Sequence, residues 1–283
     1  MPVSKPDEAV SNTVGFIIIS GILLTSVALV FVIGLPVYNK YVDQSHMQNM
    51  IEGFDLISEN GNNVALFKTP YQQSELKLYG GTITLRNAGD IHIDYYTDET
   101  GTEPCKIGVG DSITLGILEY SKDDTSLAYL LGGVFRKDTY SYPVIKNPPI
   151  YTFTDKYGPN PDTPVLVIPL IELNYKDFTM TGTTLARISF STFYRYQKSN
   201  PDVSQPSVHT YNNVKHIKVT ITSGDVDYNK CLLEYFEDEL GFAKTSGTNN
   251  PLVMEKTYTS PTTGITVNTL PTTEIVTINS GST

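Results

Sequence analysis

The sequence from Val14 to Val37 reads VGFIIISGILLTSVALVFVIGLPV and contains no charged residue. These 24 residues exceed the roughly 20 that an α-helix needs to cross the hydrocarbon core of a bilayer. A cleaved secretory signal would have an apolar region of only about 7–15 residues and a small-x-small cleavage site, and this sequence shows neither. The stretch therefore predicts a retained membrane anchor or a helix in the core of a filament.

A helical pattern continues beyond the apolar run. Between residues 38 and 59 apolar side chains recur at the three- and four-residue spacing of an amphipathic helix; they are Tyr38, Tyr41, Val42, Met47, Met50, Ile51, Phe54 and Ile57. The sequence Asn60-Gly61-Asn62 favours left-handed turns, so we expect the helix to end there. We also expect a bend at Pro36, which lacks a backbone donor. The predicted helix covers residues 13–60, with a membrane part at 14–37 and an amphipathic part at 38–59.

The composition limits the size and the partners of the rest of the chain. A chain of 283 residues can hold this helix and one sizeable domain. The formal net charge of −10 argues against a nucleic-acid surface, which needs clustered Lys and Arg. Tyrosine occurs 19 times and tryptophan not at all. Because tyrosine suits half-buried strands and exposed contact faces, this bias favours a β-rich outer domain.

From residue 61 to residue 283 the pattern changes to an alternation of polar and apolar residues, as in half-buried strands. It is clearest in Thr82–Arg86, Ile91–Tyr95, Arg187–Ser191 and His216–Thr222, with Gly-, Pro- and Asn-rich turns between them. We therefore expect an all-β antiparallel sandwich with one short helix at Asp225 to Phe242. The stretch from Thr257 to Thr283 is either a last strand with a loose tail or a solvated stalk.

The two cysteines leave two interpretations open. Cys105 and Cys231 can form a disulfide if the domain faces an oxidising exterior. Alternatively, Cys231 lies on the apolar face of the predicted short helix, where a buried thiol behaves as a small hydrophobic side chain. Neither cysteine belongs to a C-x-x-C pair, so the sequence does not predict a zinc site.

The remaining motifs do not predict catalysis or a cofactor. The segment Asp225–Asn229 matches the first ligands of a calcium loop, but Lys230 and Phe236 replace the required glycine and glutamate. We instead expect its acidic residues to lie near the positive end of a helix. His92 and Asp94 share one face of a predicted strand and are expected to form an ion pair. Phosphate loops and nucleophile elbows are absent from the sequence, so we expect neither an enzyme nor a metal site.

The segment from Glu8 to Ile19, EAVSNTVGFIII, resembles the amino terminus of archaeal type IV pilin-like and archaellin-like proteins. Short fragments further along are similar to signatures of archaeal cell-surface pilin-like proteins; they are Leu118–Tyr120, Gly132–Arg136, Val167–Leu170, Val219–Ser223 and Tyr235–Glu237. In that family a prepilin-type peptidase removes a short charged leader, and the exposed helices then bundle into a filament. The resemblance implies a polar leader at residues 1–12 that is cut before Ala9 or Val10, with Glu8 preceding the cut.

The resemblance also implies a function. We expect a structural subunit of a type IV pilus-like surface filament, with the membrane and copies of itself as partners and the β domain outside the cell. The small residues Gly15, Gly21, Ala28 and Gly34 would permit close helix contacts. The other expected membrane or filament-core residues are Val14, Phe16, Leu24, Phe31 and Pro36. A chain that keeps its leader would instead be a single-pass, membrane-anchored β-sandwich binding module that does not polymerise.

Overall fold

The computed structural model describes residues 7–67, 69–157, 162–192, 208–222, 226–245, 250–259 and 264–280. The chain forms two compact units, Met1–Asn49 and Met50–Thr283. The first unit is helical, and the second combines the end of that helix with two β-sheets and one short helix.

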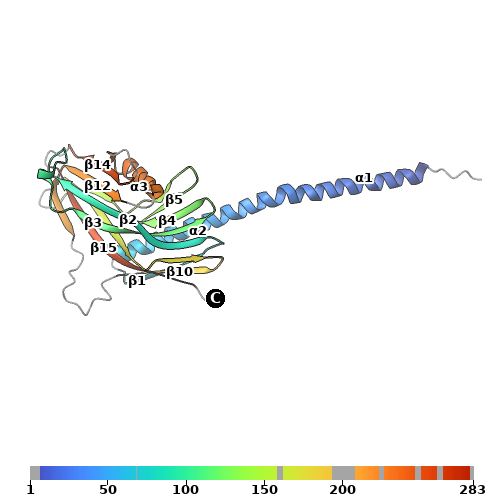
Figure 1. Cartoon of the computed structure of the whole chain (residues 1–283), viewed down its shortest axis with the longest axis horizontal. Helices are drawn as coiled ribbons and strands as arrows, with labels where there is room; N and C mark the ends of the chain where they lie inside the picture. The colour runs from blue at the N-terminus through green and yellow to red at the C-terminus, as the bar shows by residue number, and fades with distance from the viewer. Residues whose placement is uncertain are drawn as a thin grey trace, which may run out of the picture. The chain divides into compact units, whose positions relative to one another are not determined.

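The helix of the first unit is not regular throughout. It consists of α1 (Asp7–Leu29), a π-helical turn η1 (Val30–Gly34) and α2 (Leu35–Ala65), which continues into the second unit (Figure 1). The π turn lies immediately before Pro36, where we expected a bend. Proline cannot donate to the carbonyl four residues earlier and its ring crowds that carbonyl, so a locally wider turn relieves both problems. The helix begins at Asp7 rather than Thr13, and acidic residues favour a helix start.

The predicted end of this helix is wrong. Helix α2 continues through Asn60-Gly61-Asn62 and ends at Ala65. A Cβ atom at Gly61 would overlap the ring and hydroxyl of Tyr129 and would lie 3.5 Å from Phe190 Cε1. Glycine is therefore needed here for close packing of the helix against the sheets, not for a left-handed turn. Sequence alone cannot separate these two uses of glycine.

Sheet A has the strand order β1-β10-β15-β8-β7, and β11 also pairs with β15. Its strands are β1 (Tyr71–Lys77), β7 (Tyr151–Asp155), β8 (Thr163–Asn174), β10 (Leu185–Thr192), β11 (His209–Val214) and β15 (Ile265–Ser280). Strand β8 occupies one side of β15. On the other side, β10 pairs with the second half of β15 and β11 with the first half, so β10 and β11 follow one another along the same strand.

Sheet B has the strand order β13-β14-β12-β2-β3-β4-β5-β6, and β9 also pairs with β2. Its strands are β2 (Thr82–Tyr96), β3 (Asp111–Lys122), β4 (Thr125–Leu130), β5 (Gly133–Lys137), β6 (Val144–Lys146), β9 (Phe178–Thr181), β12 (His216–Thr222), β13 (Ala243–Lys244) and β14 (Leu252–Thr257). The short helix α3 (Val226–Asp238) contacts β13 and β14 at one end of this order and β5 near the other. The sheet therefore curls around α3 (Figure 1).

The expected fold class is confirmed: a long apolar N-terminal helix precedes an all-β domain with one short helix. One pairing departs from the antiparallel pattern, because β8 and β15 run parallel from Val165↔Thr266 to Asn174↔Ile275. The C-terminal stretch is a central strand of sheet A rather than a stalk. Alternate residues are buried within each half of the strand, Ile265 and Val267 in the first half and Val276 and Ile278 in the second, which explains why it joins the sheet.

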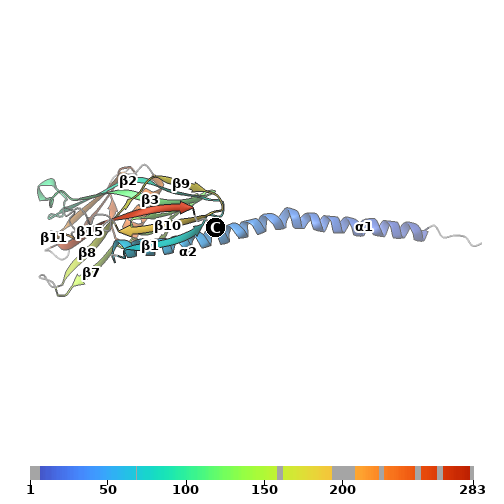
Figure 2. The same cartoon turned by 90° about the horizontal axis from the view of Figure 1, so that it is seen from below.

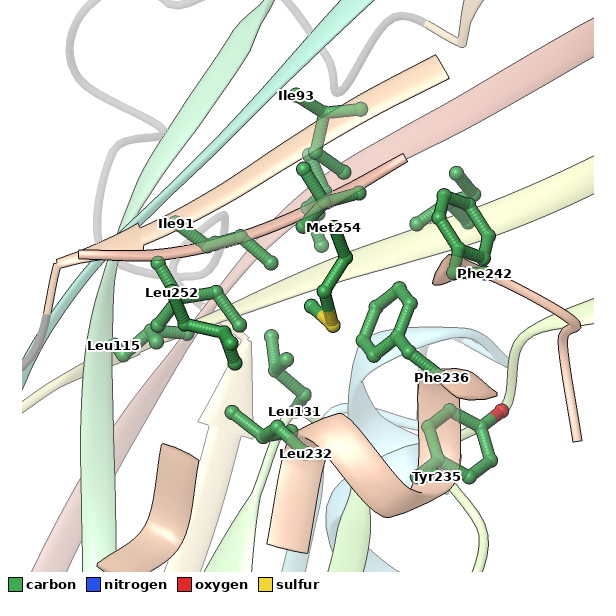
Figure 3. Close-up of a cluster of buried hydrophobic side chains, with 14 of the residues drawn as sticks. Ile91, Ile93, Leu115, Leu131, Leu232, Tyr235, Phe236, Phe242, Leu252 and Met254 are labelled. Atoms are coloured by element: carbon green, nitrogen blue, oxygen red, sulfur yellow. The ribbon is translucent and has the colours of Figure 1, made fainter. Parts of the chain in front are cut away.

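The main core lies between the two sheets and under α3. Alternate residues of β2 point into it, including Ile91 and Ile93. Figure 3 shows them facing Leu232 and Phe236 of α3, with Met254 of β14 between them. Each fully buried side chain of this size contributes roughly 1.5–3 kcal/mol. These residues supply a large share of the stability of the β domain.

The end of α2 forms part of the interior of the second unit. Its buried residues, Met50, Phe54, Ile57, Gly61 and Val64, follow the alternating four- and three-residue spacing of one helix face. Docking of the predicted amphipathic segment on the β domain is therefore confirmed for its residues from Met50 onward.

Polar contacts also fix the position of this end of α2. Ser58 Oγ donates to the Gly132 carbonyl oxygen at 2.7 Å, and Asn62 Nδ2 donates to the same oxygen at 3.0 Å. Lys146 Nζ lies 2.7 Å from Asp55 Oδ1. Together with the buried face of the helix, these contacts make the C-terminal half of α2 an integral element of the β domain.

The packing of α2 predicts a contrast between two neighbouring substitutions in the full chain. Phe54 is 0 % exposed, so Phe54→Ala should lower the free energy of unfolding by roughly 3–5 kcal/mol. Leu56 is 57 % exposed, so Leu56→Ala on the same helix should change it by less than about 0.5 kcal/mol. Denaturant unfolding followed by near-ultraviolet tyrosine circular dichroism measures both. Equal losses for the two variants would contradict the docked position of α2.

Candidate functional site

The predicted anchor presents apolar side chains on all sides. Phe16 is 73 % exposed, Leu24 68 % and Phe31 59 %, and Val14 and Val37 are exposed as well. Within the described residues, this is the one helix long and apolar enough to cross a membrane. A helix that is apolar all round requires lipid or other apolar helices around it.

The small residues of this helix have no evident role within their own unit. A Cβ atom at Gly15 or Gly21 would meet no other atom within 4 Å, and one at Gly34 would meet only Val30 Cγ1 at 3.8 Å. Ala28 is exposed. Since glycine weakens a helix by up to about 1 kcal/mol relative to alanine, its presence here calls for a reason outside the isolated helix.

Two hydroxyl groups of the apolar helix form hydrogen bonds within the helix. Thr25 Oγ1 donates to the Gly21 carbonyl oxygen at 2.7 Å, and Ser26 Oγ donates to the Ile22 carbonyl oxygen at 2.8 Å. Polar groups paired in this way can enter an apolar medium without leaving an unsatisfied donor. They are therefore compatible with the membrane or filament-core environment that the apolar surface requires.

The expected processing site lies at the start of α1. The backbone of Glu8, Ala9 and Val10 is helical. Residues 1–6 of the expected leader, and the side chains of residues 7–12, lie outside the described part of the chain. The cleavage prediction therefore stays a prediction.

The two cysteines are not joined by a disulfide. Cys105 is partly buried in the 3₁₀ turn Glu103–Cys105, whereas Cys231 is buried in α3. Cys231 Sγ lies 3.9 Å from the Arg136 carbonyl oxygen and belongs to the main core. Its role in the structure is that of a small buried side chain, the second of the two sequence-based interpretations.

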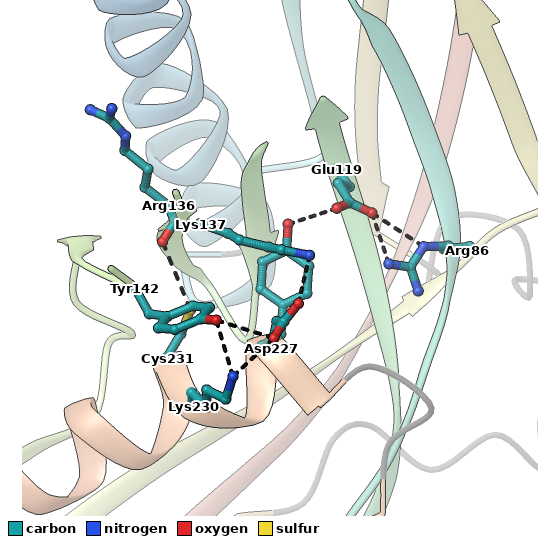
Figure 4. Close-up of polar contacts among 9 residues, drawn as sticks. Arg86, Glu119, Arg136, Lys137, Tyr142, Asp227, Lys230 and Cys231 are labelled. Atoms are coloured by element: carbon teal, nitrogen blue, oxygen red, sulfur yellow. Dashed lines mark hydrogen bonds and ion pairs between the residues drawn. The ribbon is translucent and has the colours of Figure 1, made fainter. Parts of the chain in front are cut away.

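Charged side chains form contacts between helix α3 and sheet B (Figure 4). Asp227 in its first turn lies 2.7 Å from Lys137 Nζ and 3.1 Å from Lys230 Nζ, and it accepts from Tyr142 Oη at 3.3 Å. The hydrogen bond from Lys137 is the main cause that lowers the pKa of Asp227. The acidic segment that resembled part of a calcium loop thus places a carboxylate among lysines, as expected for a helix start.

The predicted pairing of His92 with Asp94 is confirmed as a contact. His92 Nε2 lies 2.8 Å from Asp94 Oδ1, and Lys106 Nζ lies 2.8 Å from the same oxygen. The hydrogen bond to Asp94 raises the pKa of Lys106. The buried Asp94 carboxylate therefore has two partners, His92 and Lys106.

A second histidine–aspartate contact was not expected from the sequence. Asp111, at the start of β3, is buried and lies 2.7 Å from His209 Nδ1 of β11. It also accepts hydrogen bonds from Thr269 Oγ1 of β15 at 2.7 Å and from Tyr95 Oη of β2 at 3.1 Å. Four strands from both sheets therefore meet at one carboxylate. No local motif marks it, because its members lie far apart in the sequence.

The tyrosines of this cluster are strongly perturbed. Burial, reinforced by the Asp111 charge, raises the pKa of Tyr95 well above its usual value. The same causes raise the pKa of Tyr211 to about 12, and its ring stacks on Tyr95 with centroids 4.1 Å apart. Both phenols therefore stay neutral across the physiological range and act as hydrogen-bonding and packing groups.

The Asp111 cluster has only part of a hydrolytic arrangement. A catalytic triad needs a nucleophile hydrogen-bonded to the histidine that the aspartate orients. Within the described residues the His209 ring bonds to Asp111 and to no hydroxyl or thiol, and Thr269 bonds to Asp111 instead. Among the same residues, no group of three or more His, Cys, Asp and Glu side chains is arranged to hold a metal ion. What the described residues of this arrangement do is tie the two sheets together.

Glu274 is the most deeply buried carboxyl among the described residues of the β domain. It is 0 % exposed on β15, and its Oε2 atom accepts from Tyr129 Oη at 3.3 Å. Burial raises its pKa to about 8, although hydrogen bonds from Tyr129 and the Ala65 backbone act in the opposite direction. The group is therefore mostly protonated at neutral pH, next to the C-terminal turn of α2.

This shift predicts that stability falls as the pH rises. Between its ordinary pKa of 4.5 and about 8, the folded protein holds a proton on Glu274 that the unfolded chain has lost. The free energy of unfolding of the full chain should fall across this window, by at most roughly 5 kcal/mol. Glu274→Gln should remove most of that dependence. Denaturant titrations at several pH values measure it, and identical pH profiles for the two proteins would contradict the assignment.

The comparison with known proteins identifies a family but no characterised relative. No curated protein matches the sequence. No solved structure matches it either. DUF7289, a family of unknown function, matches residues 8–272, which include both the apolar helix and nearly all of the β domain. The chain therefore belongs to the DUF7289 family.

Proposed function

We propose that the protein is a structural subunit of an archaeal type IV pilus-like surface filament. Its N-terminal helices bundle in the filament core, and its β domain is displayed outside the cell. The observation that carries this proposal is the helix from Val14 to Val37, whose apolar side chains are exposed and whose glycines its own fold does not need. Apolar side chains gain little by leaving lipid for each other, so helix association depends on close approach at small residues.

The proposal includes a route from the membrane to the filament. A prepilin-type peptidase removes the leader before Ala9 or Val10, after which the helix leaves the lipid and joins other copies. The resemblance of Glu8 to Ile19 to pilin-like amino termini supports this step. In this function the β domain is a structural and adhesive module, not an enzyme. His92 and His209 are each paired with a buried aspartate, which supports that part.

The alternative is a single-pass, membrane-anchored binding module that does not polymerise. Half-exposed aromatic side chains on the edge strand β7, Tyr151 and Phe153, favour a binding role for the β domain. This alternative requires the leader to be retained, so the two functions differ in the amino terminus of the mature protein.

The first test is the amino-terminal residue of the protein from its native host. Filament assembly predicts that the mature chain begins at Ala9 or Val10, whereas a retained anchor begins at Met1 or Pro2. Mass spectrometry of the intact protein from membranes and from sheared surface material measures this directly. A chain that keeps residues 1–8 in both fractions would contradict processing for assembly.

The second test is substitution of the small residues. Gly21→Phe and Ala28→Phe should reduce extracellular filament yield about tenfold or more, because each blocks close helix approach. Leu24→Phe is the matched control, since it exchanges one large apolar side chain for another on the same helix. Filaments are counted by electron microscopy and compared with membrane-bound protein on immunoblots. Unchanged yields for Gly21→Phe and Ala28→Phe, or no filaments from the unaltered protein, would rule out the polymer.

A further inference from the structure

Sheet A carries a shallow groove of about 220 Å³ on one face of strands β7, β8, β15 and β11, which lie side by side in Figure 2. Two rows of side chains cross these strands. One row places Phe153 beside Val165 and Thr266, and the other places Tyr151 beside Val167 and Asn268. Each row therefore runs from an aromatic ring through a valine to a polar side chain.

On the β7 side, Phe153 lines the groove and Tyr151 lies beside Phe153, just outside the lining. Tyr151 and Phe153 lie two residues apart on one strand and so point to the same face. Their rings stack with centroids 6.2 Å apart and an angle of 30° between their planes. Tyr151 is 53 % exposed and Phe153 46 %. The two rings form one apolar platform that remains open to solvent.

The opposite side of the groove is polar and uncharged. Thr210 Oγ1 donates to Asn268 Oδ1 at 2.9 Å, and Thr266 Oγ1 donates to Asn212 Oδ1 at 3.2 Å. In both bonds the amide oxygen is the acceptor, so these bonds leave the amide nitrogen as the donor for a ligand. They also fix the orientation of both amides before a ligand arrives.

These features define the chemistry of the ligand. Asp155 is the one ionisable side chain in the lining of the groove, so nothing there selects an anion or a nucleic acid. The platform and the amides are two to three strand spacings apart, about 10–15 Å. A ligand that uses both must have an apolar face at one point and several hydroxyl or carbonyl groups further along. Sugar rings joined in a short chain have this character.

An extended peptide fits the arrangement less well. Among the described strands β7 is the last of sheet A, and a peptide added along it would contact only the aromatic side. The ordered Thr–Asn pairs lie on β11 and β15, across the sheet from that edge. The groove crosses the strands instead of following them.

We propose that this groove binds a short neutral oligosaccharide, with one sugar ring stacked on Phe153 and a following ring hydrogen-bonded by the amides of Asn212 and Asn268. The volume is below the roughly 300–1,000 Å³ of sites that enclose a small molecule. Binding is therefore weak at a single site and gains strength when many copies of the domain are displayed together. The proposal does not depend on polymerisation, because all of its residues belong to the β domain.

The test uses the full chain in lipid nanodiscs, because detergents with sugar headgroups would compete for the groove. Cellotriose, maltotriose, mannotriose and tri-N-acetylchitotriose are the probes, and binding is detected by saturation-transfer difference NMR and measured by titration. At least one of them should bind. Phe153→Ala should then raise Kd about tenfold, and Asn212→Ala several-fold.

Two further variants separate this site from a general loss of structure. Phe153→Tyr keeps an aromatic ring and should retain binding within about twofold. Tyr140→Ala removes a 94 % exposed tyrosine outside the groove and should leave Kd unchanged. No binding of any of the four probes overturns the proposal, as does equal binding by Phe153→Ala and Tyr140→Ala. Binding of a peptide with the sequence of residues 151–155, without binding of any probe, would assign the surface to strand addition and overturn it too.

Discussion

The close approach of α2 to Tyr129 and Phe190 at Gly61 is the contact on which the β domain depends. It brings one face of a helix between a strand of sheet B and a strand of sheet A, so that both sheets bury apolar area against the same element. A side chain at position 61 would force the helix outward and expose its buried apolar face. The helix end is thus a third layer of the domain rather than a linker.

Asp111 and Glu274 are buried carboxyls with different sets of hydrogen-bond partners. Asp111 accepts hydrogen bonds from Thr269 and Tyr95 and lies against His209. Glu274 has the Tyr129 hydroxyl as its side-chain partner, and burial therefore dominates and raises its pKa to about 8. The first group joins the sheets, and the second makes the packing around α2 sensitive to pH.

Sequence periodicity is sufficient to predict the class of this fold but not its details. The apolar run, the amphipathic spacing up to Ile57 and the alternation in β2 and β12 are local patterns, and local patterns determine helices and strands. The role of Gly61 depends on Tyr129 and Phe190, which are distant in the chain. The parallel pairing of β8 with β15 has the same long-range origin.

The candidate sites show the same contrast between local sequence patterns and long-range contacts. The apolar helix was predictable because its chemistry lies in one continuous segment. The pairing of His92 with Asp94 was predictable because two alternate residues of one strand share a face. The Asp111 cluster and the groove of sheet A were not predictable from the sequence, because each brings together residues from four strands. Sites of this kind can be recognised only when the order and pairing of the strands are known.

The family match includes both the apolar helix and most of the β domain. DUF7289 covers residues 8–272. A helix selected only to hold a domain in lipid needs length and hydrophobicity, which leucine alone supplies. The helix here has Gly15 and Gly21 at positions where its own unit gains nothing from them. Because glycine is costly in a helix, the proposed contacts between helices supply a physical reason for these two residues.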